Sequence, residues 1–229
     1  MKKFFTILFF AIIIFIIALG FLLFAFEKDI PTKYIQSSIE KVVSNYSFED
    51  FSQIDQAKDF DVSITKTNYS TTTEKETFIS KTQQKFIKTG MGGTIKVTIT
   101  EINYNEDGTI SSSKKTIYYL EKGEYCKRVN DEINIIEKEK FEKEIYNYFK
   151  EITPTNSYGK FEDESAFKII TENAKSKGLN VTIKAIEDNE EMELKYNFIT
   201  NKFVAFNKVT PIEIGLLKGK IIYNYEFNF

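Results

Sequence analysis

The first 26 residues contain one long run of apolar positions, and polar residues become frequent only after it. Residues 4–26 carry no charged side chain, and 18 of these 23 residues are Phe, Ile or Leu. A helix of this length spans about 34 Å, which is enough to cross a hydrocarbon core of roughly 30 Å. At about −0.3 to −0.6 kcal/mol for each of these side chains, insertion is favoured by roughly 5 to 11 kcal/mol. The pattern predicts a transmembrane anchor at 4–26, preceded by a short tail at 1–3.

A cleaved signal peptide is the main alternative for this run, and a buried core helix is the second. A signal peptide has an apolar core of about 7 to 15 residues followed by a small-x-small site. The best such site, Ala18–Leu19–Gly20, lies inside the run and is followed by six further apolar residues. We therefore expect a retained single-pass anchor. Lys2 and Lys3 precede it, so the positive-inside rule favours a cell-membrane protein whose soluble part lies outside the cytoplasm.

Along residues 27–229 the spacing of apolar residues changes between the helical period and the strand period. Helical spacing occurs in three segments, at 31–46, 138–152 and 163–177. Alternation of apolar and polar residues occurs in several others, most clearly at 60–65, 95–100, 191–198 and 221–229. Strands follow strands without a βαβ alternation, which disfavours a doubly wound parallel sheet. We predict one α+β soluble domain at 27–229, a curved antiparallel sheet with helices on one face.

Local signals refine several of these elements. The helix at 138–152 has an apolar stripe made of Phe141, Ile145, Tyr148, Phe149 and Ile152. Asn105–Gly108 and Asn130–Asp131 have the composition of hairpin turns. The alternation slips by one position at Glu101, which predicts a β-bulge. The glycine-rich residues 90–93 lead into a strand pattern, whereas a phosphate-binding loop leads into a helix, so we expect another hairpin turn there.

The last strand has the most regular pattern and carries the candidate site. One of its faces is aromatic and consists of Tyr223, Tyr225, Phe227 and Phe229. These side chains either belong to an ordinary sheet core beneath the helices or line part of an apolar cavity. A strongly curved sheet that is closed by helices can hold an acyl chain in such a cavity.

Composition excludes several classes of activity. The chain has no His and a single Cys, Cys126, so a His-containing catalytic triad is excluded and a zinc site is disfavoured. The net charge is −2, and Lys2 and Lys3 lie before the anchor, which leaves the soluble part without the clustered positive charge that nucleic acid needs. We expect no nucleic-acid partner, no metal and no cofactor.

The remaining chemical candidates have simpler structural interpretations. The acidic residues 187–191 coincide with an expected hairpin turn, and the acidic residues 162–164 with an expected helix start. Composition permits a Ser–Lys pair, as used by membrane-anchored signal peptidases, but no Ser lies in the context that those enzymes show. Cys126 falls in a predicted strand, where a small core residue is expected. We predict that the protein is not an enzyme.

Two stretches show a family resemblance, TIYYLEKGEYCKRVNDEINII at 116–136 and YNFITNKFVAFNKV at 196–209. With the helix between them and the final strand, this order of elements resembles the bacterial lipoprotein-carrier superfamily, the LolA-like half-barrels. The resemblance covers about 130 residues and implies an incomplete antiparallel barrel with helices closing its mouth, and a lipid or acyl-chain ligand. The carriers are periplasmic and soluble or lipid-anchored, whereas this chain has the run at 4–26.

These observations predict a cell-envelope protein but no defined activity. The expected function is a membrane-anchored extracytoplasmic binding module for an apolar ligand, such as a lipid, or for an envelope-protein partner. The alternative is a structural or interaction protein without a small ligand. An anchored hydrolase that uses Ser–Lys or carboxylate chemistry is a third hypothesis.

Overall fold

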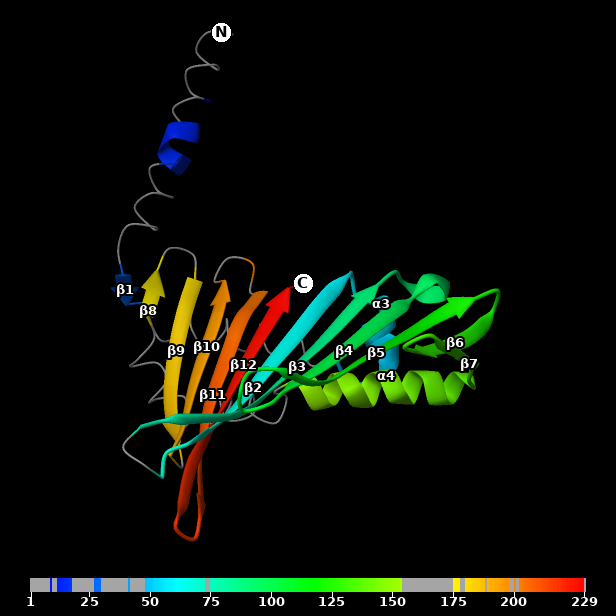
Figure 1. Cartoon of the computed structure of the whole chain (residues 1–229). Helices are drawn as coiled ribbons and strands as arrows, with labels where there is room; N and C mark the ends of the chain where they lie inside the picture. The colour runs from blue at the N-terminus through cyan, green and yellow to red at the C-terminus, as the bar shows by residue number, and fades with distance from the viewer. Residues whose placement is uncertain are drawn as a thin grey trace.

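The computed structural model describes residues 9, 12–17, 27–29, 41, 48–72, 75–153, 175–177, 180–187, 189–197, 200 and 202–228. Within these residues one open antiparallel sheet of 12 strands dominates the structure, accompanied by few helices (Figure 1). The predicted α+β class with an antiparallel sheet is therefore confirmed at this level.

The strands fall into two groups along the chain. The first group is β2 (Phe60–Ser70), β3 (Thr77–Thr89), β4 (Lys96–Tyr104), β5 (Ile110–Glu121), β6 (Glu124–Val129) and β7 (Glu132–Ile135). The second group is β8 (Lys175–Lys177), β9 (Asn180–Glu187), β10 (Glu190–Asn197), β11 (Lys202–Ile214) and β12 (Leu217–Asn228), with β1 (Glu27–Asp29) paired to β8. Besides the helical residues 12–17, the described helices are α3 (Phe51–Gln56), α4 (Lys138–Ile152) and the 3₁₀ turn η1 (Gly92–Thr94). Along the chain, α3 precedes the first group, η1 lies within it, and α4 lies between the two groups.

The two groups are joined in space by the pairing of β12 with β2. The strand order is β1-β8-β9-β10-β11-β12-β2-β3-β4-β5-β6-β7, so the last strand of the chain lies in the middle of the sheet. The register runs without a shift from Gly219 opposite Ser70 to Asn228 opposite Asp61. All other neighbours except β1·β8 are close in sequence, so this one long-range pairing makes the sheet continuous.

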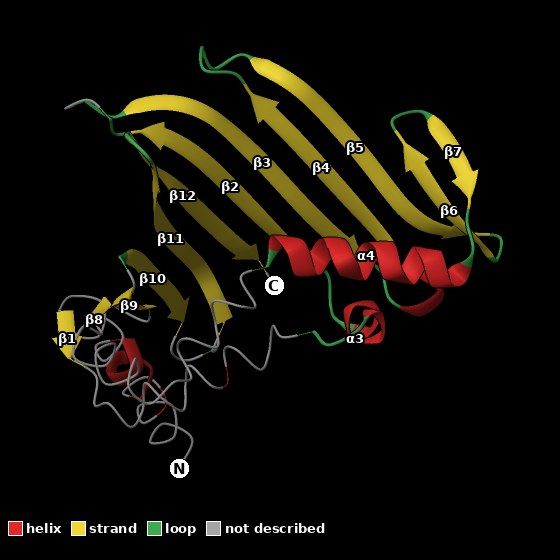
Figure 2. Ribbon diagram, turned by 90° about the horizontal axis from the view of Figure 1, so that it is seen from below, coloured by secondary structure: helices red, strands yellow, loops and turns green. Residues whose placement is uncertain are grey.

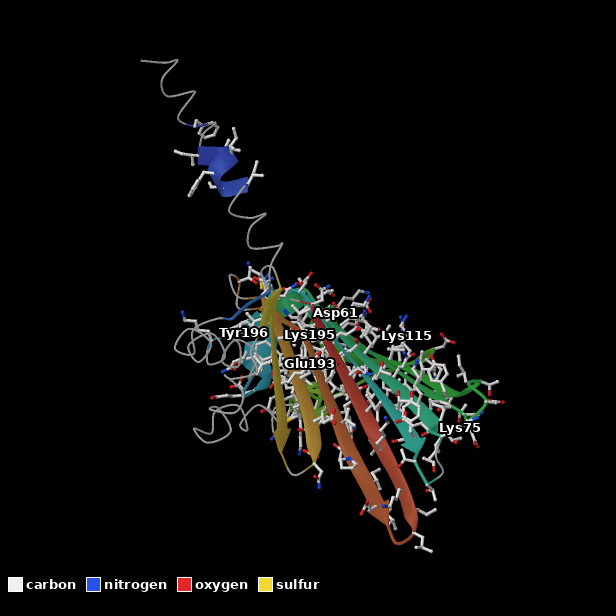
Figure 3. The ribbon with its side chains drawn as sticks, turned by 90° about the vertical axis from the view of Figure 1, so that its left-hand side faces the viewer. Asp61, Lys75, Lys115, Glu193, Lys195 and Tyr196 are labelled. Atoms are coloured by element: carbon white, nitrogen blue, oxygen red, sulfur yellow. The ribbon has the colours of Figure 1, made fainter. Side chains whose placement is uncertain are left out.

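The alternation that predicted β2 is explained by the position of its inward residues. Phe60, Val62 and Ile64 are buried, while the intervening side chains are partly exposed. A strand with one face on a core and the other toward water needs this period of two. The outer side of the sheet carries ion pairs such as Lys195–Glu193 at 2.9 Å on β10, next to the inward-facing, buried Tyr196 (Figure 3).

Helix α4 lies across one face of β2 to β6 (Figure 2). Four residues of its predicted stripe are buried and Tyr148 is partly buried, so the predicted stripe is confirmed. Phe149 is the centre of this contact, because its ring packs edge-on against Phe60 at 5.8 Å and against Phe86 at 5.5 Å. The short helix α3 begins at the Asp50 cap, which accepts a hydrogen bond from the Gln53 N–H, and Ile54 anchors it in the same core.

Several sequence predictions are confirmed by these elements. Helix α4 matches the predicted 138–152, and the strands predicted at 60–65, 95–100, 191–198 and 221–229 lie in β-structure where they are described, except that Ile95 caps the end of η1 and β4 begins at Lys96. The turns at 90–93, 105–108 and 130–131 each join two antiparallel neighbours. Cys126 is free and buried, as expected for a small core residue.

Two predictions are wrong in detail. The helix predicted at 163–177 does not reach Lys177, because Lys175–Lys177 form β8 between β1 and β9. Pairing with a strand on each side outweighs the helical spacing there. The β-bulge predicted at Glu101 lies instead between Asn103 and Tyr104, next to the hairpin turn.

Other predictions fall mainly outside the described residues. These are most of the helix at 31–46, the start of the helix at 163–177 and most of the run at 4–26, in which residues 12–17 are helical. Among the described helices, none combines the length and the apolarity that a membrane crossing requires.

The contact of α4 with the sheet gives a first testable prediction. Replacing Phe149 by Ala leaves a cavity among Phe60 and Phe86, and we expect it to lower the free energy of unfolding by about 3 to 5 kcal/mol. Urea denaturation followed by circular dichroism measures this loss. The control is Ile135→Ala on β7, whose side chain is exposed, with an expected change within about 0.5 kcal/mol. Equal losses in the two variants would contradict the packing described.

Candidate functional site

The candidate site lies on the face of the sheet that α4 covers, which we call the inner face (Figure 2). Residues that oppose each other across antiparallel strands point to the same side. Phe227 opposes Val62, and Tyr225 opposes Ile64. Since Val62 and Ile64 belong to the core beneath α4, the predicted aromatic residues of β12 point to the inner face.

Three of the four predicted aromatic residues form a column along β12. The Tyr223 and Tyr225 rings stack with centroids 6.4 Å apart and an interplanar angle of 15°. The Tyr225 and Phe227 rings stack at 6.5 Å and 11°. Phe206 on β11 adds a tilted ring 5.6 Å from Tyr225. The fourth predicted residue, Phe229, lies outside the described residues.

The column passes from buried to partly exposed along the strand. Tyr225 and Phe227 are 8% and 7% exposed, whereas Tyr223 is only partly buried. Burial raises the pKa of the Tyr225 hydroxyl to about 12, with a smaller contribution from Tyr223. Tyr225 and Phe227 are thus core residues, and Tyr223 is the member of the column that a ligand can reach.

Beyond Tyr223 the inner face becomes polar. The Lys66 ammonium lies over the Tyr223 ring, 5.7 Å from its centroid, in a cation–π arrangement. Lys66 opposes Thr82 on β3, and Thr82 opposes Asn103 on β4. The Thr82 hydroxyl donates to Asn103 Oδ1 at 2.9 Å.

The same polar surface extends over four strands. Asn68 Nδ2 donates to Ser80 Oγ at 2.7 Å, and Asn103 Nδ2 donates to Ser112 Oγ at 3.0 Å. Gln84 Nε2 donates to Glu101 Oε1 at 3.1 Å. These cross-strand bonds form a ladder of amides and hydroxyls from β2 to β5, which we call the polar ladder. Its groups can bind polar ligand atoms by exchanging hydrogen bonds, but they do not suit an acyl chain.

A carboxylate on α4 fixes the helix to the sheet at the other end of the inner face. Glu144 Oε2 accepts hydrogen bonds from the Tyr118 hydroxyl at 2.9 Å and from Lys127 Nζ at 2.8 Å. The Lys127 ammonium also lies 5.5 Å from the centroid of the Tyr118 ring. Burial alone would raise the pKa of the Glu144 carboxyl, but the hydrogen bonds from Lys127 and Tyr118 outweigh it and lower that pKa.

Lys88 is the one fully buried charged side chain among the described residues. Its Nζ donates to the carbonyl of Ala57, the residue that ends α3. Burial lowers the pKa of its ammonium, while Asp55 and Asp59 oppose this shift. This bond ties α3 to β3 and gives Lys88 a structural role.

A small open pocket of about 180 Å³ lies next to Lys88 at the end of β2 and β12. Its lining residues are Asp59, Phe60, Asp61, Ile87, Lys88, Thr89 and Asn228. Sites for small molecules occupy about 300 to 1,000 Å³, so this pocket is too small for an acyl chain. Within the described part of the chain, no group of three or more Cys, Asp or Glu side chains is placed to hold a metal ion.

Comparison with known proteins adds no family assignment. No protein-family model matches the chain, and no curated protein matches it either. The resemblance to LolA-like half-barrels therefore stays a prediction.

Sequence reasoning identified the aromatic column but missed the polar ladder and Lys88. The ladder lies in strands whose polar residues occur on both faces, so no alternation marks it. The cross-strand pairs Asn68–Ser80 and Thr82–Asn103 follow only from the register. No sequence signal separates Lys88 from the many exposed lysines.

The Glu144 contact predicts a pH dependence of stability. A carboxyl whose pKa is lowered by folding stabilises the protein above its unfolded pKa, near 4.5, and this contribution is lost as the pH falls through the folded value. We therefore expect wild type to be more stable than Glu144→Gln at pH 7 and the difference to shrink in acid. Urea denaturation of both proteins from pH 7 to pH 3 measures it. A difference that is constant over this range would contradict the role of the ionised carboxylate.

Proposed function

We propose that this protein is a membrane-anchored extracytoplasmic binding module that recognises a cell-envelope partner and does not catalyse a reaction. Residues 4–26 form the anchor, and residues 27–229 form the domain that binds. The partner contacts the part of the inner face that α4 leaves open, at Tyr223, Lys66 and the polar ladder.

The observation that supports the anchor most is the exposure of its apolar side chains. Phe9 and Ile12 to Ile17 include six large apolar residues that are at least 50% exposed, on all sides of the helix at 12–17. Burying such a side chain is worth about 1.5 to 3 kcal/mol, so water is a poor solvent for this segment. A helix that is apolar all round suits a bilayer.

The composition of the inner face supports a polar or macromolecular partner. Tyr223 offers an aromatic surface, and the polar ladder offers amide and hydroxyl groups beside it. The Lys66 ammonium and the Glu101 carboxylate contribute both signs of charge. Such a mixed surface fits a partner with hydrogen-bonding groups better than it fits a hydrocarbon chain.

A second candidate function is an apolar-ligand carrier, as the resemblance to LolA-like half-barrels implies. It is favoured by the stacked rings of Tyr223, Tyr225 and Phe227 and by the open antiparallel sheet with α4 across one face. In this function the ligand lies against the column, and Tyr223 is its accessible end.

Native mass spectrometry of the protein purified from its own cells separates the two functions. We expect no acyl-chain species whose binding depends on Tyr223, because the reachable inner face is polar. The measurement compares wild type, Tyr223→Ala and the surface control Ile133→Ala. A lipid that is retained by wild type and Ile133→Ala but lost from Tyr223→Ala would favour the carrier function.

Membrane fractionation tests the anchor. We expect the full-length protein to stay in the membrane pellet after alkaline carbonate washing, because a spanning helix resists extraction. In a variant with Ile14→Lys and Ile16→Lys, each charge costs about 2.5 to 3.5 kcal/mol at the bilayer centre, and we expect loss from the pellet. Release of the wild-type protein would contradict the proposal.

Labelling of intact cells tests on which side of the membrane the domain at 27–229 lies. Asp131 is exposed in the turn between β6 and β7, whereas the native Cys126 is buried. A membrane-impermeant maleimide should therefore label Asp131→Cys on intact cells and leave the wild type unlabelled. Labelling of Asp131→Cys only after permeabilisation would place the domain in the cytoplasm.

A further inference from the structure

The hairpin that joins β11 and β12 ends in an exposed aliphatic tip. Ile214 opposes Leu217, and Gly215 and Leu216 form the turn between them. Ile214 is 70% exposed, Leu216 is 92% exposed and Leu217 is 66% exposed. We call Ile214, Leu216 and Leu217 the hairpin tip.

The conformation of the turn explains Gly215 but not the leucine after it. Gly215 has φ +63°, which glycine adopts without strain. The usual residues beside such a glycine are Asn, Asp or Ser, which bind water or the local backbone. The aliphatic side chain of Leu216 is 92% exposed and forms no hydrogen bond with water. Its exposure therefore indicates a contact outside the chain.

The hairpin extends past the neighbouring strand on one side. Glu191 of β10 opposes Val209, and β11 continues from there to Ile214. The hairpin consequently projects beyond the end of β9 and β10 (Figures 1 and 3). The hairpin tip can therefore insert into an apolar environment outside the protein while the rest of the sheet stays in place.

The chemistry of the tip favours lipid over protein. All three side chains are aliphatic, whereas the residues that dominate protein interfaces are Trp, Tyr and Arg, with Leu under-represented. Two lysines follow the tip on β12: Lys218 lies 3.5 Å from Glu213, and Lys220 pairs with Glu76. Lysines next to an apolar insertion can extend to lipid phosphates.

We propose that the hairpin tip inserts into the outer surface of the same bilayer that holds residues 4–26. This inference rests on the proposed anchor. A domain tethered directly to a membrane meets that membrane at a high effective concentration, so three aliphatic side chains suffice for a lasting contact. The tip is thus a second membrane contact, at the other end of the domain from the anchor.

The register defines how the domain must then lie. The strand register places Glu27, the first residue after the anchor, at the same end of the sheet as Lys202. The two are connected by successive cross-strand pairs on β8, β9 and β10. Ile214 lies 12 residues further along β11, about 40 Å away at the rise of a strand. The anchor at Glu27 and the hairpin tip at Ile214 can both contact one bilayer when the strands lie roughly parallel to its surface.

A fluorescent probe on the tip tests the insertion. The full-length protein, with Ile214→Cys labelled by an environment-sensitive dye, is reconstituted in vesicles of equal parts phosphatidylglycerol and phosphatidylethanolamine. Nitroxide-labelled lipids should quench this dye. Leu216→Ser with Leu217→Ser should lower the insertion equilibrium by about a hundredfold and abolish the quenching.

Two controls separate the tip from other surfaces. Ile133→Ser with Ile135→Ser removes two exposed aliphatic side chains from β7 and should leave the quenching at position 214 unchanged. A dye on Asp131→Cys should not be quenched. A dye at position 214 that the nitroxide-labelled lipids do not quench would overturn the proposal. This holds even if the dye is bright, because a bright but unquenched dye contacts protein and not lipid.

Carbonate washing of the same vesicles distinguishes this inference from the proposed function. Protein that resists the wash with an unquenched dye at position 214 would contradict the tip insertion alone. Protein that is washed away although its dye was quenched beforehand would contradict the anchor alone. We expect resistance to the wash together with quenching.

Discussion

The pairing of β12 with β2 is the interaction on which the rest of the structure depends. It joins strands from opposite ends of the chain, and without it the sheet would separate into β2 to β7 and β8 to β12, with β1 at the outer edge. The pairing also aligns the two halves of the core, because it places Tyr225 beside Ile64 and Phe227 beside Val62. Each half then presents its apolar residues to the same side, and α4 covers part of this shared face.

The inner face changes in character along the strands, and this change decides which functions fit. Under α4 the face is closed by the rings of Phe60, Phe86 and Phe149 and is fixed by the Glu144 contact with β5 and β6. Past Tyr223 it carries hydrogen-bonding side chains that hold one another in place. An apolar core beside a polar open surface is the organisation of a scaffold that presents a binding surface, in keeping with the proposed module.

The sequence revealed those elements whose inward side is buried and apolar. Alternation marked β2 and β12, and helical spacing marked α4 to its ends, because one face of each contacts the core. The strand β3 was harder to recognise, since Thr82 and Gln84 point to the open inner face and break the alternation. The three polar residues of β8 form a strand only because β1 and β9 pair with them. The aromatic column was predicted, but the β12–β2 pairing that gives it neighbours depends on tertiary structure and has no local signal.

Hydrogen exchange followed by mass spectrometry tests the continuous sheet most directly. Amides of the β2 and β12 residues that pair with each other lie in the centre of the sheet, and central strands open only in global unfolding. We predict that segments 61–70 and 219–228 are protected together and exchange at the same slow rate as the core-facing part of β3. Rapid exchange of 219–228 while β2 to β5 stay protected would contradict the account, because the last strand would then not be part of the first group's sheet.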